Sequence, residues 1–362
     1  MTETHKHGGN PFEELERLNL PERDVIDFSV NLNPLGMPGI INKNWNTLIN
    51  SVKDYPSVEG RGIIDFYTKK TGVEPSEFLA GNGSTELIYL IPRVLCLKKV
   101  LIITPSFHDY ERASLLSGAA VVRYPLDAHE GFNIKSFADL EEQLICCDAV
   151  WLGRPNNPTA SLIPKELIIT LAEKFPDKYF VVDEAFIQFT DNWKSESLIS
   201  SKRYPNVILI HSFTKFYAIA GLRMGGVIGN KDIISRFKER KEPWSVNGIA
   251  EGVASLLLEC DGYESETVQY LKKERERMHS RLADIESIDI FPSVTNFFLC
   301  RWKGTSDLDD LIVHLLKNGI YIRDCRNFPG LEDNYFRIGI RTAPDNDLLI
   351  SCLASFEEGV QV

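Results

Sequence analysis

The sequence lacks the cysteine pattern of a disulfide-stabilised or zinc-binding protein. Its 7 cysteines are an odd number and are scattered, and only Cys146 and Cys147 are adjacent. Disulfide-rich domains and structural zinc sites instead repeat cysteine pairs at short, regular spacings. We therefore expect reduced thiols and no metal site.

No apolar run is long enough to span a membrane, which takes about 20 consecutive apolar residues in a helix. Residues 1–7 contain no apolar core of a secretory signal. Clustered positive charge is equally scarce, because 40 Lys and Arg residues stand against 51 Asp and Glu residues, a formal net charge of -11. Nucleic-acid binding needs a basic patch. We therefore expect a cytoplasmic protein whose partners include neither a membrane nor a nucleic acid.

Strand-like apolar runs alternate with helix-like stretches between about residues 79 and 228. Such alternation favours a mostly parallel sheet covered by helices. After residue 244 the pattern changes to a long helical region that reaches about residue 286, and shorter strands follow, which is typical of a smaller α+β domain. We place the domain change near residue 250. The runs that we expect to be strands are 100–103, 119–122, 181–182, 207–210, 297–300, 320–322 and 336–340.

Lys215 is the first candidate for chemistry. It follows the apolar, β-branched run 207–210, and a residue just past the carboxyl end of a buried parallel strand faces a ligand crevice. A lysine there can form a Schiff base with an aldehyde when burial or neighbouring cations lower its proton affinity. Taken alone, a lysine beside Ser212 and Thr214 is more often a solvated loop residue.

Two further polar residues end or follow apolar runs. Asp183 ends the run 179–182, where a buried carboxylate needs a cationic partner, and a protonated pyridine nitrogen would be one. An acid that caps the following turn is an equally good interpretation of Asp183 alone. Asn157 follows the run 149–152, and by itself its Asn-Pro pair indicates only a turn.

In this order, the segments around Asn157, Asp183 and Lys215 resemble the fold-type I enzymes that use pyridoxal 5'-phosphate, the aspartate aminotransferase superfamily. The resemblance covers nearly the whole chain. It implies an α/β fold, in which a large domain with a mostly parallel seven-stranded sheet accompanies a smaller α+β domain. It also implies that Lys215 forms the Schiff base with the cofactor, that Asp183 pairs with the pyridinium nitrogen, and that Asn157 donates to the ring hydroxyl group.

The same resemblance implies how the rest of the cofactor is held. The residues expected at its phosphate are Gly83, Ser84, Thr85, Ser212, Thr214 and Arg223. The first three lie in a glycine-rich turn that opens a helical pattern, and the amino end of a helix favours an anion. Phe107 matches the position whose aromatic ring stacks on the cofactor. Tyr55 matches a tyrosine that reaches the cofactor phosphate of the neighbouring subunit, which implies a homodimer.

The resemblance also divides the chain. Residues 1–45 are expected to form an N-terminal arm that contributes to the small domain. Residues 46–250 would then form the large cofactor-binding domain, and residues 251–362 the small C-terminal domain.

Three arginines late in the chain, Arg323, Arg337 and Arg341, indicate a substrate with more than one anionic group. An arginine holds a carboxylate or a phosphate through two parallel hydrogen bonds. Arg337 and Arg341 lie four apart in a strand-like segment, so we expect their side chains on one face. Structural ion pairs would explain the arginines as well. By the resemblance, Arg337 holds the substrate α-carboxylate and Arg323 holds a substrate phosphate, as in histidinol-phosphate aminotransferases and their relatives.

Four further segments resemble the family of L-threonine-O-3-phosphate decarboxylases, namely 7–10, 27–36, 243–247 and 327–331. This resemblance implies decarboxylation of L-threonine O-3-phosphate to (R)-1-amino-2-propanol O-2-phosphate in cobalamin biosynthesis, and it leaves L-serine O-phosphate open as a second substrate. It adds His7, Gly8 and Asn31 to the substrate-binding arginines. Histidinol-phosphate aminotransferase activity is the alternative, because the two reactions differ by a rotation about one bond.

Three residues depart from the family pattern, and one of them, Ala160, replaces a common glycine. Arg154 stands where relatives more often have a small hydroxyl residue, and of an extra anion contact and a surface residue we favour the surface residue. Phe186 stands where many aminotransferases have a tyrosine that donates to the ring oxygen of the cofactor. We therefore expect Asn157 to be the sole side-chain donor to that oxygen.

Overall fold

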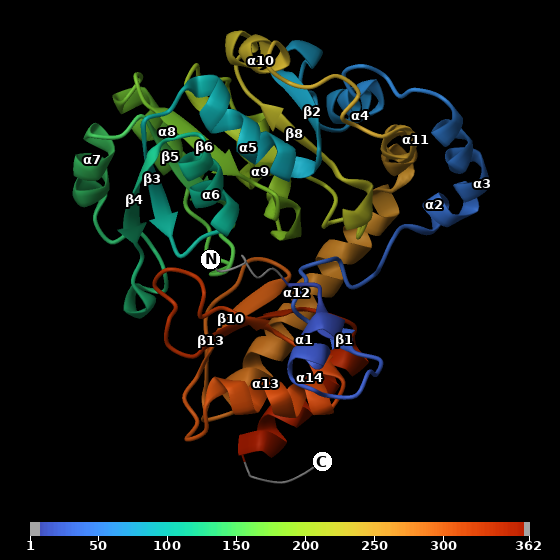
Figure 1. Ribbon diagram of the computed structural model, residues 1–362, viewed down its shortest axis with the longest axis vertical. Helices are drawn as coiled ribbons and strands as arrows, with labels where there is room; N and C mark the ends of the chain where they lie inside the picture. Colours follow the sequence, from blue (N-terminus) through green and yellow to red (C-terminus); the bar gives the residue numbers. More distant parts are fainter. Residues whose placement is uncertain (1–7, 358–362) are drawn as a thin grey trace.

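A seven-stranded sheet forms the centre of the larger part of the molecule (Figure 1), in the strand order β2-β8-β7-β6-β5-β3-β4. The computed structural model describes residues 8–357. Strand β8 runs antiparallel to both of its neighbours, and the other neighbouring pairs are parallel. The predicted α/β fold with a mostly parallel seven-stranded sheet is therefore confirmed. The strands are β2 Phe78–Asn82, β3 Lys99–Thr104, β4 Ala120–Pro125, β5 Ala149–Gly153, β6 Tyr179–Asp183, β7 Val207–His211 and β8 Met224–Ile228.

Successive strand residues point to opposite faces of the sheet, and helices cover both faces. In β5, Ala149 and Trp151 join the apolar cluster under the helices α5, α6 and α10, whereas Val150 and Leu152 join the cluster that includes α4, α7 and α8. Both faces are thus apolar, which explains why the strands appear as continuous apolar runs in the sequence.

The helices of the described part are short, apart from the 23-residue helix α12. No helix within residues 8–357 combines the length and the apolar character that crossing a bilayer requires. The helices are α1 Pro11–Arg17, α2 Gly39–Lys43, α3 Trp45–Leu48, α4 Arg61–Thr71, α5 Gly83–Leu95, α6 His108–Leu116, α7 Phe137–Ile145, α8 Lys165–Lys174, α9 Trp193–Glu196, α10 Lys231–Lys238, α11 Gly248–Leu256, α12 Asp261–Ala283, α13 Leu308–Lys317 and α14 Ala343–Glu357.

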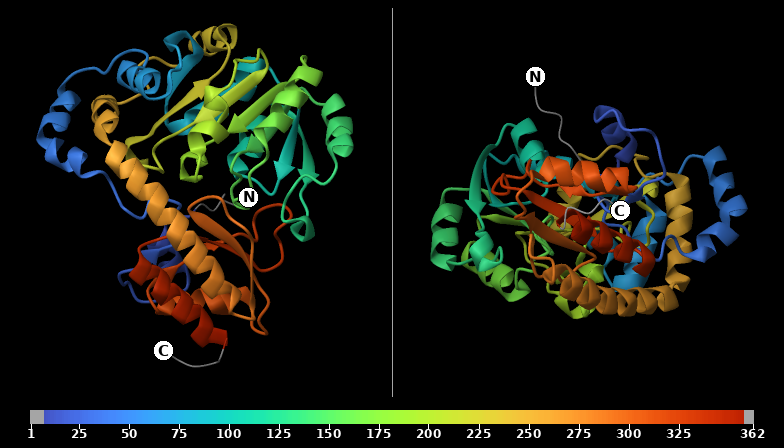
Figure 2. Two further views of the ribbon diagram at one scale, coloured as in Figure 1. Left: turned by 180° about the vertical axis from the view of Figure 1, so that it is seen from behind. Right: turned by 90° about the horizontal axis from the view of Figure 1, so that it is seen from below.

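The smaller part of the molecule contains a four-stranded antiparallel sheet in the order β12-β13-β10-β9. Near the N-terminus, β1 (Ile26–Asp27) pairs in parallel with β11 (Ile320–Tyr321), so the beginning of the chain returns to the smaller part. Helix α12 runs from the larger part to the smaller one (Figure 2). The domain limits at residues 45 and 250 stay predictions. The strands of the four-stranded sheet are β9 Ile288–Ile290, β10 Phe297–Trp302, β12 Arg323–Asp324 and β13 Tyr335–Gly339.

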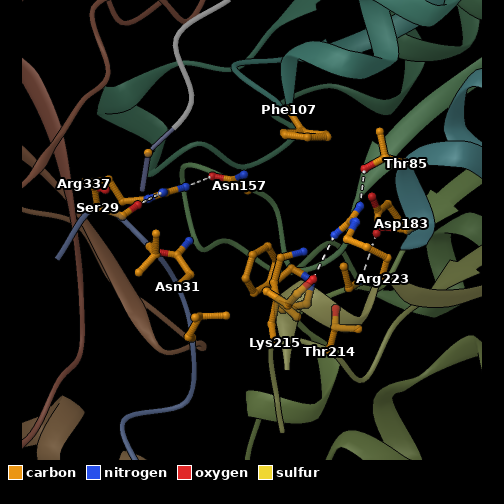
Figure 3. Close-up of a pocket in the computed structure, with 18 of the residues that line it drawn as sticks. Ser29, Asn31, Thr85, Phe107, Asn157, Asp183, Thr214, Lys215, Arg223 and Arg337 are labelled. Atoms are coloured by element: carbon orange, nitrogen blue, oxygen red, sulfur yellow. Dashed lines mark hydrogen bonds between the residues drawn. The ribbon is translucent and has the colours of Figure 1, made fainter. Parts of the chain in front are cut away.

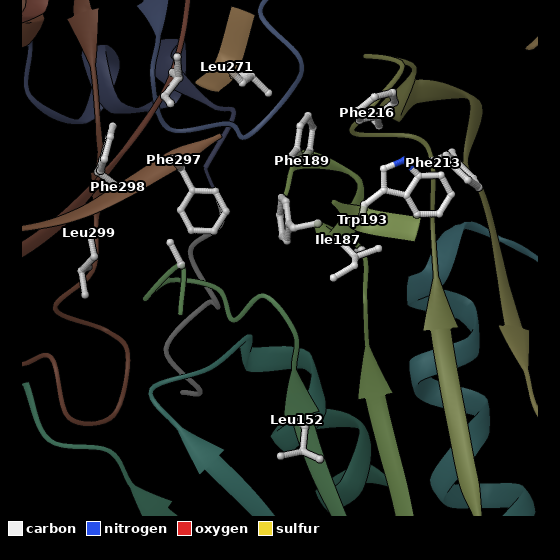
Figure 4. Packing of buried hydrophobic residues seen from close by; sticks show 14 of the residues in the cluster. Leu152, Ile187, Phe189, Trp193, Phe213, Phe216, Leu271, Phe297, Phe298 and Leu299 are labelled. Carbon is white, nitrogen blue, oxygen red and sulfur yellow. The ribbon is translucent and has the colours of Figure 1, made fainter. Parts of the chain in front are cut away.

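One apolar cluster continues from the larger part into the smaller part (Figure 4). The ring centroid of Phe297, in β10, lies 5.1 Å from that of Phe186, which follows β6. Within the larger part, the ring centroids of Phe189 and Phe216 lie 5.3 Å apart. Because the Phe186 and Phe297 rings pack edge-on across the junction, they help to fix the distance between the two parts.

The predicted long helical region after residue 244 consists of α11 and α12, which a short 3-10 turn separates. One expectation about the later part of the chain is wrong. Arg341 is not in a strand with Arg337, because β13 ends at Gly339. Beyond that strand, the Arg341 backbone exchanges hydrogen bonds of 2.9 Å with the amide side chain of Asn346 in α14.

The surface assignment of Arg154 is also wrong, because its side chain is fully buried. Its Nη1 donates to Oε1 of Glu184 at 2.9 Å, and its Nε donates to the backbone oxygen of Ile163 at 2.7 Å. Arg154 and Glu184 directly follow the neighbouring parallel strands β5 and β6. The sheet therefore brings together two charges that lie 30 positions apart in the sequence.

Replacing Arg154 should destabilise the protein strongly. Arg154→Met would leave the Glu184 carboxylate buried without its ion-pair partner, and breaking a buried pair in this way costs about 3–5 kcal/mol. We expect a loss of that size in the free energy of unfolding in urea. Arg123→Met is the matched control: Arg123 pairs with Glu111 at 2.6 Å with half of its side chain exposed, and its loss should cost less than about 1 kcal/mol. Equal losses in the two variants would contradict this account.

Candidate active site

A cavity of about 280 Å³ lies at the carboxyl ends of β5, β6 and β7, between the larger and the smaller part. The position is the one that open α/β sheets offer to ligands. Its lining comes from many separate segments of the chain, which Figure 3 shows converging. The predicted site residues that line it are Gly8, Asn31, Ser84, Thr85, Phe107, Asn157, Asp183, Thr214, Lys215, Arg223 and Arg337.

Lys215 and Asp183 form the charged centre of the cavity. Burial lowers the pKa of the Lys215 amine, and the carboxylate of Asp183 opposes that change. The nearby guanidinium groups of Arg223 and Arg337 lower the pKa of this amine further. The amine also lies 4.4 Å from the centroid of the Phe186 ring. Lys215 therefore has the environment of a lysine that gives up its proton easily.

Asp183, at the end of β6, is held by two hydrogen bonds. The Tyr110 hydroxyl donates to its Oδ2 at 2.9 Å, and the Ala185 backbone N–H donates to its Oδ1 at 2.9 Å. Burial raises the pKa of Asp183, whereas the Lys215 charge and the two hydrogen bonds oppose the rise. Both donors stabilise the ionised carboxylate.

One end of the cavity is built to receive an anion. Helix α5 begins there at Gly83, so its first backbone N–H groups and the positive end of its dipole face this wall. Nη2 of Arg223 donates to Oγ1 of Thr85 at 3.4 Å. A methyl group on Gly83 would lie 2.5 Å from that Nη2, and Gly83 has a φ of +74°. Only glycine fits here without displacing the guanidinium group.

Thr214 and Ser212, in the turn after β7, complete the anion-binding end of the cavity. Oγ of Ser212 lies 2.8 Å from Oγ1 of Thr214, and it donates to the backbone oxygen of Met224 at 3.1 Å. Thr214 lines the cavity, whereas Ser212 lies behind it. Ser212 thus orients Thr214 in this structure.

The opposite wall belongs to the smaller part and carries Arg337. Nη2 of Arg337 donates to the backbone oxygen of Ser29 at 2.6 Å, and Nη1 donates to Oδ1 of Asn157. Because Oδ1 of Asn157 is engaged, the amide nitrogen is the Asn157 group that remains to donate. Burial, together with the neighbouring Arg323 charge, lowers the pKa of Arg337 to about 10. A bound anion would relieve both effects.

Asn31 lies beside Arg337 and is 6% exposed. Within the described residues, both of its amide atoms and Nε of Arg337 are buried without a hydrogen-bond partner. Buried polar groups are normally paired, so these atoms indicate a polar ligand at this wall.

Gly8 closes the cavity next to Ser29. A methyl group on Gly8 would lie 2.5 Å from the Ser29 backbone oxygen, so only glycine allows this approach. The N–H of Gly9 donates to Oγ of Ser29 at 2.8 Å, and that hydroxyl donates to Asp27 at 2.6 Å. The N-terminal segment is therefore tied to the cavity wall.

Other predicted site residues lie outside the lining. Arg323 is buried beside Arg337, and Gly83 lies under Arg223. Tyr55 is 88% exposed on the outer surface. His7 lies outside the described residues.

Comparisons with known proteins agree with this geometry. Residues 23–353 match the model of the family described as aminotransferase class I and II. The chain belongs to this family. The chain is 36% identical to a protein of Caldanaerobacter subterraneus subsp. tengcongensis that is named as a threonine-phosphate decarboxylase, over 98% of this chain and 95% of the relative. It is 32% identical to the threonine-phosphate decarboxylase of Salmonella typhimurium, over 98% and 97%.

Among solved structures, the histidinol-phosphate aminotransferase of Clostridium acetobutylicum is similar to the chain, with a TM-score of 0.85 and 33% identity, over 92% of this chain and 99% of that one. As a member of the class I and II family, the chain is a pyridoxal-phosphate-dependent enzyme. Its near full-length similarity to threonine-phosphate decarboxylases confirms the predicted carboxy-lyase class.

The residues present fit this cofactor. The amino end of α5 and Arg223 suit its phosphate, and the carboxyl group of Asp183 suits the protonated ring nitrogen. Lys215 supplies an amine with a lowered pKa in the same cavity.

Sequence reasoning missed Tyr110. The signal was present, because Tyr110 lies three positions after Phe107 and therefore returns to the same side at the start of α6. Its ring stacks on Trp151 with centroids 5.1 Å apart, and burial raises the pKa of its phenol, so it stays a donor to Asp183.

Removing the Tyr110 hydroxyl should weaken cofactor binding. Tyr110→Phe takes a hydrogen bond from the ionised carboxylate, so the pKa of Asp183 should rise and its pairing with a cationic ring nitrogen should weaken. We expect the dissociation constant of pyridoxal phosphate to rise on the order of tenfold, with the largest effect at acidic pH, where Asp183 becomes protonated.

The measurement is a titration of the apoenzyme with the cofactor, followed by visible absorption across a range of pH. Tyr89→Phe is the control, because Tyr89 donates to Asp109 at 2.8 Å outside the cavity lining. An unchanged affinity at every pH in Tyr110→Phe would contradict the role of this hydroxyl.

Proposed function

We propose that the enzyme decarboxylates L-threonine O-3-phosphate to (R)-1-amino-2-propanol O-2-phosphate, a step of cobalamin biosynthesis. The observation that carries the proposal is the pairing of Arg323 with Arg337. The two residues lie directly opposite each other on the antiparallel strands β12 and β13, so their side chains start on the same face of the sheet. Two neighbouring guanidinium groups suit a substrate with two anionic groups.

Each end of the substrate then has its own grip. Arg337, inside the cavity, takes the α-carboxylate, and Arg323 takes the phosphate. Asn31 and Gly8 line the space between the N-terminal segment and Arg337, and their polar groups serve the same ligand. We assign His7 to this group by the family resemblance alone.

Two grips on one small molecule fix the rotation about its α-carbon bonds. When bound, pyridoxal phosphate supplies an electron-accepting ring that stabilises negative charge at the substrate α-carbon. Arg323 and Arg337 decide which α-carbon bond stands across that ring, so binding energy remote from the reaction sets the reacting geometry. In the proposed reaction this bond leads to the carboxylate, which leaves as carbon dioxide.

A proton must then replace the carboxylate on the α-carbon. Lys215 is the assigned donor, because its pKa is lowered and it can hold and release a proton at Nζ. Asp183, which accepts a hydrogen bond from Tyr110, is assigned to pair with the cationic ring nitrogen. Asn157, anchored through Oδ1 to Arg337, directs its amide nitrogen to the ring oxygen. Thr85, Thr214 and Arg223 hold the cofactor phosphate together with the amino end of α5.

Carbon dioxide release from O-phospho-L-threonine tests the reaction. We expect the wild-type holoenzyme to release it together with aminopropanol phosphate. Arg337→Gln should lower kcat/KM by a factor of about 100 or more, because a charge-assisted, bidentate contact to the carboxylate is lost. Arg301→Gln is the control, since Arg301 packs on the Tyr335 ring outside the cavity lining. Transamination of histidinol phosphate by 2-oxoglutarate, without carbon dioxide release, would establish the alternative instead.

Discrimination against L-serine O-phosphate should be modest. That substrate lacks one methyl group, and a pocket gains only about 1–3 kcal/mol from such a group. We therefore propose that L-serine O-phosphate is accepted at a lower rate.

We also propose that the active unit is a homodimer in which Tyr55 contacts the cofactor phosphate of the partner. Tyr55 is 88% exposed and its ring lies 5.7 Å from that of Trp244, which is itself half exposed. We infer that further exposed apolar side chains between residues 37 and 58, together with Trp244, form a patch of the kind that marks protein interfaces. This patch consists of Met37, Trp45, Ile49, Val52, Tyr55, Val58 and Trp244.

Mixing two defective variants tests the shared site. Tyr55→Ala should bind the cofactor weakly and Lys215→Ala should be inactive. In a hybrid dimer one site would carry both defects and the other neither, so random re-association should restore about a quarter of wild-type activity at limiting cofactor. Activity that stays at the sum of the two separate variants, with hybrids present by sedimentation and mass analysis, would exclude a tyrosine shared between subunits.

A further inference from the structure

Arg323 is held by a short segment of the smaller part, residues 325–331. Arg323 is 5% exposed and lies outside the cavity lining. Its Nη2 donates to Oδ1 of Asn327 at 3.0 Å, and its Nη1 donates to the backbone oxygen of Asp324 at 2.5 Å. The centre of its guanidinium group lies 5.2 Å from the centroid of the Phe328 ring. A ring face and an amide oxygen therefore fix this group in two directions.

Phe328 also connects Arg323 to the larger part of the molecule. The Phe328 ring stacks on the imidazole of His108, with centroids 4.1 Å apart and an angle of 30° between the planes. His108 is the first residue of α6 and directly follows Phe107, which lines the cavity. Phe328 is 2% exposed, so its side of the stack is buried, whereas His108 is half-buried. The order His108, Phe328, Arg323, Arg337 thus forms one continuous row from the cofactor side to the substrate side.

The contacts in this row hold Arg323 in place against electrostatic repulsion from Arg337. Arg323 and Arg337 are opposite one another on adjacent strands, and like charges in such positions repel. An unrestrained arginine has many side-chain conformations and would turn away from its neighbour. Stacking on an aromatic face and a hydrogen bond to a fixed amide oxygen hold it in place beside Arg337.

We propose that Asn327 and Phe328 are positioning residues that hold Arg323 for the phosphate of the substrate, and that His108 locks them to the larger part. The proposal rests on the proposed function and adds a specificity device to it. The ligand class is an amino acid that carries a phosphate monoester. Preorganisation lowers the entropy that ordering Arg323 would otherwise cost on binding. The affinity of the phosphate end therefore depends on residues that do not touch the substrate.

Steady-state kinetics of Phe328→Leu on O-phospho-L-threonine tests this role. Leucine keeps an apolar side chain but removes the ring face from Arg323 and His108. We expect KM to rise about tenfold, because the phosphate grip is loosened, and kcat to fall by a smaller factor, because the carboxylate grip and Lys215 are untouched. Asn327→Ala should shift KM in the same direction.

Phe356→Leu is the matched control. The ring centroid of Phe356 lies 4.9 Å from that of His314. These two residues form a second His–Phe pair, which lies within the smaller part and outside the cavity lining. We expect its KM to match that of wild type. His108→Phe, which keeps an aromatic face against Phe328, should retain the wild-type KM, whereas His108→Ala should raise it.

Binding of inorganic phosphate to the holoenzyme, measured by isothermal titration calorimetry, reports on Arg323 without any turnover. Phe328→Leu and Arg323→Gln should both weaken it, and the double variant should be no weaker than Arg323→Gln alone. If Phe328→Leu matches wild type in KM and in phosphate affinity, or if kcat falls while KM is unchanged, the positioning role is wrong. A wild-type enzyme that binds phosphate through Arg323 but releases no carbon dioxide would instead contradict the proposed function.

Discussion

The burial of opposite charges at the carboxyl ends of parallel strands is the constraint on which this molecule depends. Lys215 follows β7 and Asp183 ends β6, and neither charge is stable in such a place alone. Arg154 and Glu184 repeat the arrangement one residue further along, as a fully buried pair. The cofactor would complete the first pair, whereas the second pair is complete within the protein. The same sheet edge therefore carries both the chemistry and the ion pair that supports it.

The second constraint is the junction of the two parts. The cavity needs Arg337 from the smaller part and Lys215 from the larger, and the aromatic cluster around Phe186 and Phe297 keeps them at a fixed separation. Arg337 then bonds across the junction to Asn157. A substrate held between the two walls experiences one rigid surface, so the proposed choice of bond follows from packing as well as from charge.

Much of the site could be predicted from the sequence, because its motifs are local. The apolar runs before Asn157, Asp183 and Lys215 place these residues at neighbouring strand ends once the sheet is parallel. Pairings between distant segments could not be predicted in the same way. Arg154 was assigned to the surface because its partner Glu184 lies on another strand, and Tyr110 was missed because its importance comes only from its bond to Asp183.

By itself the sequence determined the class of fold, the family and the lysine, aspartate and asparagine that come together in the cavity, because strand periodicity and short motifs act over a few residues. The tertiary structure alone decided which arginine faces the cavity. Arg323 and Arg337 became neighbours through strand pairing, whereas Arg341 was removed beyond the end of β13. Strand register is a property of two segments together, and neither segment carries it alone.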